Sequence, residues 1–181
     1  VFDDLPCIVN NDAVRVQALT GPELWKAARN PAAPNRPIAN LSFGLNYFFG
    51  DYDTRGYHVV NILVHAINGC LVYWLVFLTL RAHAQASSAG SGSSSAATSG
   101  HRQLAAAATA ALWTVHPVQT QAVTYIVQRM TSLATMFFLL ALCLYIAFRH
   151  ADRRRQRRAW WAAAFCGLLA IGSKEIAVTL P

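Results

Sequence analysis

Two adjacent carboxylates, Asp3 and Asp4, stand near the start of a chain in which charged residues are scarce. A carboxylate can accept a proton from a reacting hydroxyl group, and a second acid beside it can position it or help to hold a metal ion. For an arbitrary acidic pair, a helix cap or a solvated loop is the commoner role. Adjacent residues cannot share one face of a regular element, so we expect only one of the two to face a reactant.

Cationic side chains that could bind an anion lie far from this pair in sequence. Arg129 is the first choice, because its planar guanidinium can bind a phosphate through two parallel hydrogen bonds. Arg36, Lys174 and His116 are the further candidates. The alternatives are a snorkelling Arg129 at a membrane interface, a helix stop at His116 and an exposed surface pair formed by Lys174 and Glu175.

Polar side chains also interrupt apolar sequence. His58, Asn61 and His65 are spaced i, i+3, i+7, so a helix would carry them on one face. Such groups inside a membrane face a protein interior or a wet cavity, or they form hydrogen bonds between helices. We expect His58 and Asn61 to line a cavity, together with Glu175 and with Gln121 on a polar-faced helix at 117–130.

Composition places these residues in a membrane protein. Of 181 residues, 55% are hydrophobic and 13% are charged, against about 25% charged in soluble domains. The net charge of +7 comes mainly from short basic runs between apolar segments, which is typical of membrane topology and argues against a nucleic-acid partner. The four cysteines form no CxxC pair, so neither a zinc site nor a disulfide framework is indicated.

The pattern predicts an all-α chain that crosses the membrane several times. Residues 1–54 read as an extramembrane loop with short amphipathic helices near 21–29 and 39–49. The segment 104–116 is short for a span unless its helix begins in the Ser/Ala-rich stretch before it. The expected segments are transmembrane helices at 56–80, 104–116, 131–148 and 159–172, a low-complexity linker at 82–103, and a basic loop at 149–158.

The positive-inside rule predicts which segments share a face. The six arginines of 149–158 should be cytoplasmic, and Arg81 and Arg102 beside the linker agree. Residues 1–54, 117–130 and 173–175 then fall on the opposite, outer face. This arrangement would bring Asp3 and Asp4 to the same face as the candidate cations.

The order of several motifs resembles one known family. The stretches FDD, NRPIANLSFGLNY, GYHVVNILVHAIN, HPVQTQAVTYIVQR and SKEIAVTLP are similar to the membrane half of bacterial and eukaryotic TMTC-type proteins. Those are GT-C-class glycosyltransferases with C-terminal tetratricopeptide repeats, related to protein O-mannosyltransferases. The resemblance covers nearly the whole chain except 82–103, and we expect the chain to be a fragment. Eukaryotic members more often carry Glu where Gln121 stands.

The resemblance implies a transmembrane helical bundle of GT-C type and a mechanism. A polyprenyl-phosphate monosaccharide, with mannose as the sugar, would be the donor, and a Ser or Thr hydroxyl of a protein the acceptor. Asp3 would be the base and Asp4 its neighbour, or the reverse, with inversion at the sugar. Cations led by Arg129 would stabilise the lipid-phosphate leaving group.

Further expectations concern location, metal and acceptor. The family points to a bacterial inner membrane with the site facing the periplasm. No metal or other cofactor is indicated beyond the lipid-linked donor: two acids could hold a divalent ion, but no third carboxylate is placed to help. The sequence leaves the oligomeric state open. It also leaves open a GT-C enzyme with a lipid or glycan acceptor, and a non-catalytic transporter or scaffold module.

Overall fold

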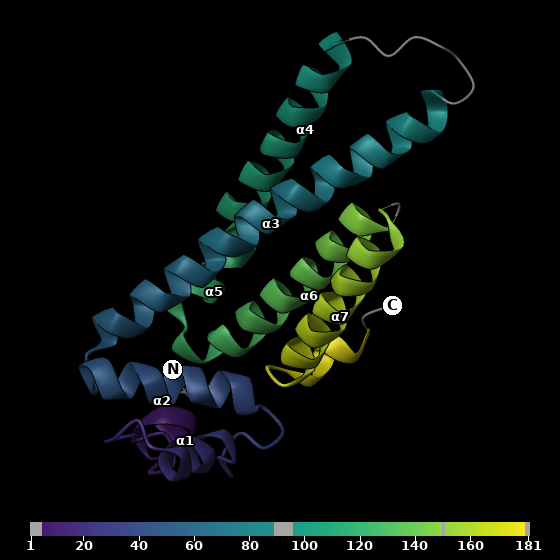
Figure 1. Ribbon diagram of the computed structural model, residues 1–181. Helices are drawn as coiled ribbons and strands as arrows, with labels where there is room; N and C mark the ends of the chain where they lie inside the picture. Colours follow the sequence, from purple (N-terminus) through teal and green to yellow (C-terminus); the bar gives the residue numbers. More distant parts are fainter. Residues whose placement is uncertain (1–4, 89–95, 150, 180–181) are drawn as a thin grey trace.

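The computed structural model describes residues 5–88, 96–149 and 151–179. Every regular element within these ranges is a helix, which confirms the all-α prediction. Asp3 and Asp4 lie outside the described residues. The fold consists of a small helical cap formed by residues 5–50 and of long helices that run away from it (Figure 1).

The cap contains the π-helix η1 (Leu5–Val9), α1 (Gly21–Ala28) and α2 (Pro37–Gly50). Proline stands in the first turn of both α-helices, where its fixed φ favours helix formation and no amide donor is lost. Both short helices occur where the sequence predicted them. α2 ends at Asp51, whose φ of 51° takes the chain out of helical geometry.

A chain of buried amides holds the cap loops on α2. The Asn11 amide donates to Asn30 Oδ1 at 2.7 Å, and the Asn30 amide donates to Asn40 Oδ1 at 3.4 Å. Asn40 then donates to the carbonyl of Ala33 at 2.9 Å. Because buried polar groups are costly when unpaired, this network specifies one loop conformation beside Arg36.

The long helix α3 (Thr54–Ser88) pairs with α4 (Ala96–Val115). A Cβ added at Gly69 would come within 2.7 Å of Thr114 Oγ1, so the two helices approach closely there. The His65 ring stacks on Trp113 and contacts the carbonyl of Thr114 at 3.1 Å.

The expected linker at 82–103 is helical on both flanks, a difference from the prediction of a flexible segment. α3 continues to Ser88 and α4 begins at Ala96. Alanine is the strongest helix former, and extending an existing helix is much easier than starting one. The apolar segment 104–115 is by itself short for a membrane span, and the helical residues from Ala96 onward lengthen it.

The polar-faced helix predicted at 117–130 is broken into three short pieces. They are the 3-10 helix η2 (Pro117–Gln119), α5 (Thr120–Thr124) and the 3-10 helix η3 (Ile126–Gln128). Tyr125 has extended backbone angles of φ −102° and ψ 112°, which end α5. The Asn61 amide donates to the Tyr125 carbonyl at 3.3 Å and so satisfies one acceptor freed by this break.

The last helices form a hairpin. α6 (Arg129–Phe148) and α7 (Arg153–Ile171) lie side by side, and the 3-10 helix η4 (Glu175–Thr179) follows (Figure 1). Asp152 caps α7 by accepting a hydrogen bond from the Arg155 amide at 3.3 Å. α7 starts six residues before the predicted span at 159–172, so its first two turns carry the arginines.

Two helices in the described part of the chain are long and apolar enough to cross a membrane, Thr54–Ser87 and Ile126–Phe148. α4 and α7 are helices at the predicted places without meeting the same criterion. The polar Ser/Thr/Gly/His/Arg opening of α4 and the arginines of α7 lower their apolar length. Membrane-spanning character is therefore established by length and composition for two of the four expected spans.

Segments distant in sequence meet at the cap end of the long helices. The beginnings of α3 and α6 contact α2, the end of α7 reaches α2 through the hydrogen bond between Ile38 and Gly172, and the segment containing α5 packs on α3 and α6 (Figure 1). The α6–α7 connection lies at the opposite end. Arg129, Lys174 and Glu175, which the sequence assigned to one face of the membrane, thus lie at one end of the structure.

Candidate functional site

Arg129 is the most deeply buried cation at the cap end, with 0% of its surface exposed. Its Nε donates to Asn61 Oδ1 at 2.7 Å, and its Nη2 donates to the Tyr57 carbonyl at 2.8 Å. Its Nη1 donates to Asn46 Oδ1 at 2.7 Å and to the Ser42 carbonyl at 3.3 Å. One side chain at the start of α6 therefore ties α2 and α3 together.

The charge of Arg129 is compensated without a carboxylate among its described contacts. The guanidinium carbon lies 4.9 Å from the centroid of the Phe43 ring and 5.4 Å from that of Tyr57. Cation–π attraction is strongest where water is excluded, and the neutral oxygens use the N–H donors. This offsets part of the large cost of burying a charge.

This geometry changes the predicted role of Arg129. A donor-phosphate contact needs a guanidinium that a ligand can reach, whereas this one lies inside the protein and already makes four hydrogen bonds to protein oxygens. The structure gives Arg129 a role in fastening α2, α3 and α6. The first choice among the predicted phosphate ligands is therefore not positioned as the sequence suggested.

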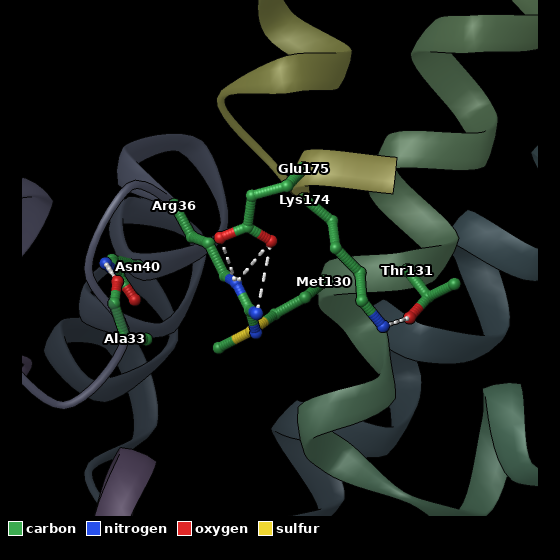
Figure 2. Close-up of polar contacts among 7 residues, drawn as sticks. All are labelled: Ala33, Arg36, Asn40, Met130, Thr131, Lys174 and Glu175. Atoms are coloured by element: carbon green, nitrogen blue, oxygen red, sulfur yellow. Dashed lines mark hydrogen bonds and ion pairs between the residues drawn. The ribbon is translucent and has the colours of Figure 1, made fainter. Parts of the chain in front are cut away.

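A second group of charges lies at the surface of the same end (Figure 2). We call it the Arg36–Lys174 cluster; it consists of Arg36, Thr131, Lys174 and Glu175. Arg36 Nε donates to both Glu175 oxygens at 3.3 and 3.2 Å, and Arg36 Nη2 lies 3.2 Å from Oε2. The side chains of Arg36 and Glu175 are 30% and 51% exposed, so a ligand can reach this pair.

Lys174 reaches from the other side of the cluster. Its Nζ donates to Thr131 Oγ1 at 2.7 Å, in the first turn of α6 (Figure 2). A hydroxyl orients the ammonium group but does not neutralise it. Arg36 and Lys174 carry two positive charges and Glu175 one negative charge, so the cluster keeps one positive charge in excess, and the positive end of the α6 dipole lies beside it.

Backbone contacts hold the two halves of the cluster at a fixed separation. Arg36 is the residue that precedes the first turn of α2, and the Ile38 amide donates to the Gly172 carbonyl at 3.0 Å. A Cβ on Gly172 would come within 3.1 Å of Ile38 Cγ1 and 3.3 Å of the Leu168 carbonyl. Glycine therefore allows the end of α7, and with it Lys174, to approach α2.

Glu175 is held in its ionised form. Its own backbone N–H, and then Arg36, lower the pKa of this carboxyl below the ordinary value of 4.5. At neutral pH Glu175 thus accepts hydrogen bonds and cannot act as a proton donor. Its role within the cluster is to hold Arg36 in place.

The remaining predicted residues lie along the segment that contains α5. His116 is exposed and accepts a hydrogen bond from the Val118 amide at 3.2 Å, which caps η2. His58 Nδ1 contacts the Val123 carbonyl at 3.2 Å, and Asn61 is fully buried. Gln121 is exposed. His58 and Asn61 thus hold this segment against α3.

The residues that follow the predicted carboxylates are part of the cap. η1 begins at Leu5, and its Ile8 is buried in the hydrophobic core that contains Phe43, Tyr57 and Met130. The rings that face Arg129 belong to this same core. Within the described ranges, no group of three or more His, Cys, Asp or Glu side chains is placed to hold a metal ion.

Three of the four residues that accept hydrogen bonds from Arg129 (Ser42, Asn46 and Tyr57) were not predicted from the sequence, and Asn61 was predicted only as a cavity residue. Ser42 and Asn46 on α2, and Tyr57 and Asn61 on α3, are each spaced four residues apart, so each pair lies on one helix face. Only Asn46 and Asn61 accept through side-chain oxygens, whereas Ser42 and Tyr57 accept through backbone carbonyls, which no residue pattern marks. The same spacing cannot show which cation supplies the donors.

Similarity to curated proteins is high across nearly the whole chain. It is 32% identical over 194 residues to "Protein O-mannosyl-transferase TMTC4" of Homo sapiens, which covers 99% of this chain and 25% of that protein. It is 32% identical over 198 residues to "Protein O-mannosyl-transferase Tmtc3" of Drosophila melanogaster, covering 99% and 21%. The chain thus spans about a quarter of the length of these relatives. No protein-family model and no solved structure matches it.

Proposed function

We propose that this chain, which is homologous over nearly its whole length to TMTC-type protein O-mannosyltransferases, is the region of a membrane glycosyltransferase that binds the sugar donor and supplies the catalytic base. The enzyme would transfer mannose from a polyprenyl-phosphate donor to a Ser or Thr hydroxyl of a protein. The observation that carries this proposal is the similarity itself, because the curated relatives named above share the same printed activity.

The proposed donor site is the Arg36–Lys174 cluster. A lipid phosphate is amphipathic, so its binding site must combine accessible cations with a neighbouring path into the bilayer. Arg36 and Lys174 are partly exposed and stand beside the start of α6, a helix of membrane-spanning character. The excess positive charge would stabilise the phosphate as the bond to the sugar breaks.

The proposed base is Asp3 or Asp4. One carboxylate would take the proton from the acceptor hydroxyl while the hydroxyl oxygen forms a bond to the anomeric carbon from the opposite side. The bond between that carbon and the phosphate oxygen breaks, and the electron pair leaves with the lipid phosphate, so the sugar configuration is inverted. A phosphate leaving group needs little help from an acid, which suits a site rich in cations.

Support for this arrangement comes from the cap. η1, which directly follows Asp4, packs through Ile8 into the same core as the beginning of α6, and Arg36 contacts Met130 in that first turn. We therefore place the base and the cations on one side of the membrane. The positive-inside rule makes it the outer side, which for a bacterial inner membrane is the periplasm.

The polar residues inside α3 favour the enzyme over a transporter. His65 contacts the Thr114 carbonyl, and the Asn68 amide donates to the Ser132 carbonyl at 3.0 Å. These bonds join helices to one another, which favours a structural role for both side chains over a transport path, although the Asn68 Oδ1 atom is buried without a described partner. A lipid or glycan acceptor would use the same donor site and base, and acceptor analysis is what separates it from a protein acceptor.

The test is a transfer assay with polyprenyl-phosphate mannose and a Ser/Thr-containing acceptor protein, using the complete protein that carries this chain. Asp3→Asn or Asp4→Asn should abolish transfer, while Asp12→Asn, which alters an exposed acid paired with Arg15 at 2.8 Å, should leave it unchanged. Full activity in both Asp3→Asn and Asp4→Asn would overturn the base. Mass spectrometry of envelope proteins with and without the gene identifies the acceptor.

A further inference from the structure

The end of the molecule opposite the cap carries a different kind of surface. The connection between α6 and α7 and the first turns of α7 hold the chain's densest group of arginines, and Trp160 and Trp161 follow them with 57% and 73% of their surface exposed. Neither the proposed catalysis nor the proposed donor site uses these residues.

Part of this surface is a hollow of about 940 Å³ along one side of α7. Arg153, Arg157, the adjacent pair Trp160 and Trp161, and Ala164 follow one another at intervals of three or four positions, so they share one helix face. The residues that line the hollow are Arg153, Arg154, Gln156, Arg157, Trp160, Trp161 and Ala164. Guanidinium groups thus stand at one end of the hollow and indole rings at the other.

An apolar groove of about 550 Å³ continues from this hollow between α6 and α7. Trp160 and Ala164 line both spaces, and the Trp160 ring packs edge-on against Tyr145 with 5.7 Å between centroids. The other residues of the groove are Ala141, Leu142, Ile146 and Ala163, all small or apolar. A basic hollow therefore leads directly into an apolar groove.

The arginines of the hollow are not neutralised by the acid beside them. Asp152 accepts from the Arg155 amide and lies 3.4 Å from Arg155 Nε, and Arg155 does not line the hollow. For residues 149 and 151–158 the structure describes this one ion pair. This open hollow is therefore suited to an anion, and the groove between α6 and α7, at about 550 Å³, lies in the volume range of about 300–1,000 Å³ that ligand sites occupy.

We propose that the basic hollow and the adjoining groove together bind a membrane phospholipid with an anionic headgroup. Its phosphate would lie among Arg153, Arg154 and Arg157, and an acyl chain would lie between α6 and α7. α6 has membrane-spanning character up to Phe148, so the arginines stand where headgroups are, and exposed tryptophans are typical of that level. Free phosphate would leave the apolar groove unused.

The experiment measures lipid retention by native mass spectrometry. The complete protein is purified in detergent, stripped of lipid and incubated with either dioleoylphosphatidylglycerol or dioleoylphosphatidylcholine. We expect preferential retention of phosphatidylglycerol. Arg153→Gln with Arg157→Gln should reduce that retention about tenfold or more, because each arginine near a headgroup contributes comparably.

A matched control separates a site from general positive charge. Arg155→Gln with Arg158→Gln removes the same charge from residues outside the hollow and should retain phosphatidylglycerol within about twofold of the parent. Ala164→Phe fills the groove at an exposed position and should reduce retention of both lipids. Equal loss in the two arginine variants, equal retention of the two lipids by the parent, or no bound lipid because another segment covers the groove would each overturn the proposal.

Discussion

Arg129 and Arg36 lie at the same end of the molecule and have opposite surroundings. Arg129 is fully buried between two aromatic rings and donates to neutral oxygens. Arg36 is partly exposed, and its partner is a carboxylate. A guanidinium that donates to several oxygens inside the protein holds helices together, whereas one at the surface can exchange its partner for a ligand. Burial, not residue type, thus distinguishes the two.

The largest effect should follow the loss of Arg129. Arg129→Met removes the donor to the side-chain oxygens of Asn46 and Asn61, and orphaned buried acceptors cost about 1–3 kcal/mol each. We expect unfolding or a loss of at least about 3 kcal/mol, measured by thermal melting in detergent. Arg129→Lys should rescue little of it, because an ammonium group cannot match the planar fork. A stable but inactive Arg129→Lys would instead indicate a ligand contact.

Lys174→Gln should separate binding from stability in the surface cluster. The amide can still donate to Thr131, so we expect little change in melting temperature, while transfer from polyprenyl-phosphate mannose should fall about 10²-fold as a charge that stabilises the leaving group is lost. Lys26→Gln, on the exposed surface of α1, is the control and should be fully active. Unchanged transfer in Lys174→Gln would remove Lys174 from the proposed donor site.

Asn46→Ala tests how the buried arginine shares its bonds. Nη1 of Arg129 loses its 2.7 Å partner and keeps the 3.3 Å bond to the Ser42 carbonyl. We therefore expect a loss of about 1–2 kcal/mol in the free energy of unfolding, smaller than for Arg129→Met. Denaturant or thermal melting measures it. A loss as large as that of Arg129→Met would mean that Asn46 alone positions the guanidinium.

The smallest effect concerns pH and the Arg36–Glu175 pair. The pKa of Glu175 is lowered in the folded protein, so its stabilising contribution is complete above the ordinary value of 4.5 and is lost as the pH falls through the lower, folded-state pKa. An exposed pair contributes at most about 1 kcal/mol. Glu175→Gln should remove this part of the acid dependence of melting, and adding Arg36→Gln should then change little. An additive double variant would show that the pair is not coupled.

Much of the helical pattern was predictable because it depends on local sequence. The long apolar runs, the proline at 117 and the cap prolines set where helices begin and break. The errors came from competition between local and tertiary effects. Alanine-rich flanks extended α3 and α4 into the expected linker. Asn61 and His58 hold the carbonyls around Tyr125, and the helix predicted at 117–130 is broken there.

The sequence indicated which residues belong to the candidate site better than it indicated what each of them does. Charge distribution along the chain correctly grouped Arg129 with Lys174 and Glu175 at one end. It could not rank the arginines, because burial depends on how α2, α3 and α6 pack. The residues that surround Arg129 come from positions 42 to 61, and no local pattern connects them to position 129.

The sequence by itself determined the helical class, the apolar segments of membrane-spanning character, the resemblance to TMTC-type proteins and the grouping of the candidate cations Arg129 and Lys174 at one end. The resemblance follows from the order of the motifs, and the other three follow from composition, periodicity and charge, which are properties of neighbouring residues. Only the tertiary structure decided that Arg129 is buried and links helices by hydrogen bonds, while Arg36 and Lys174 remain accessible. Whether a cation is buried or accessible depends on which oxygens and rings the other helices bring to it. Because burying a charge is costly without such partners, Arg129 and Arg36 have different roles although their side chains are chemically identical.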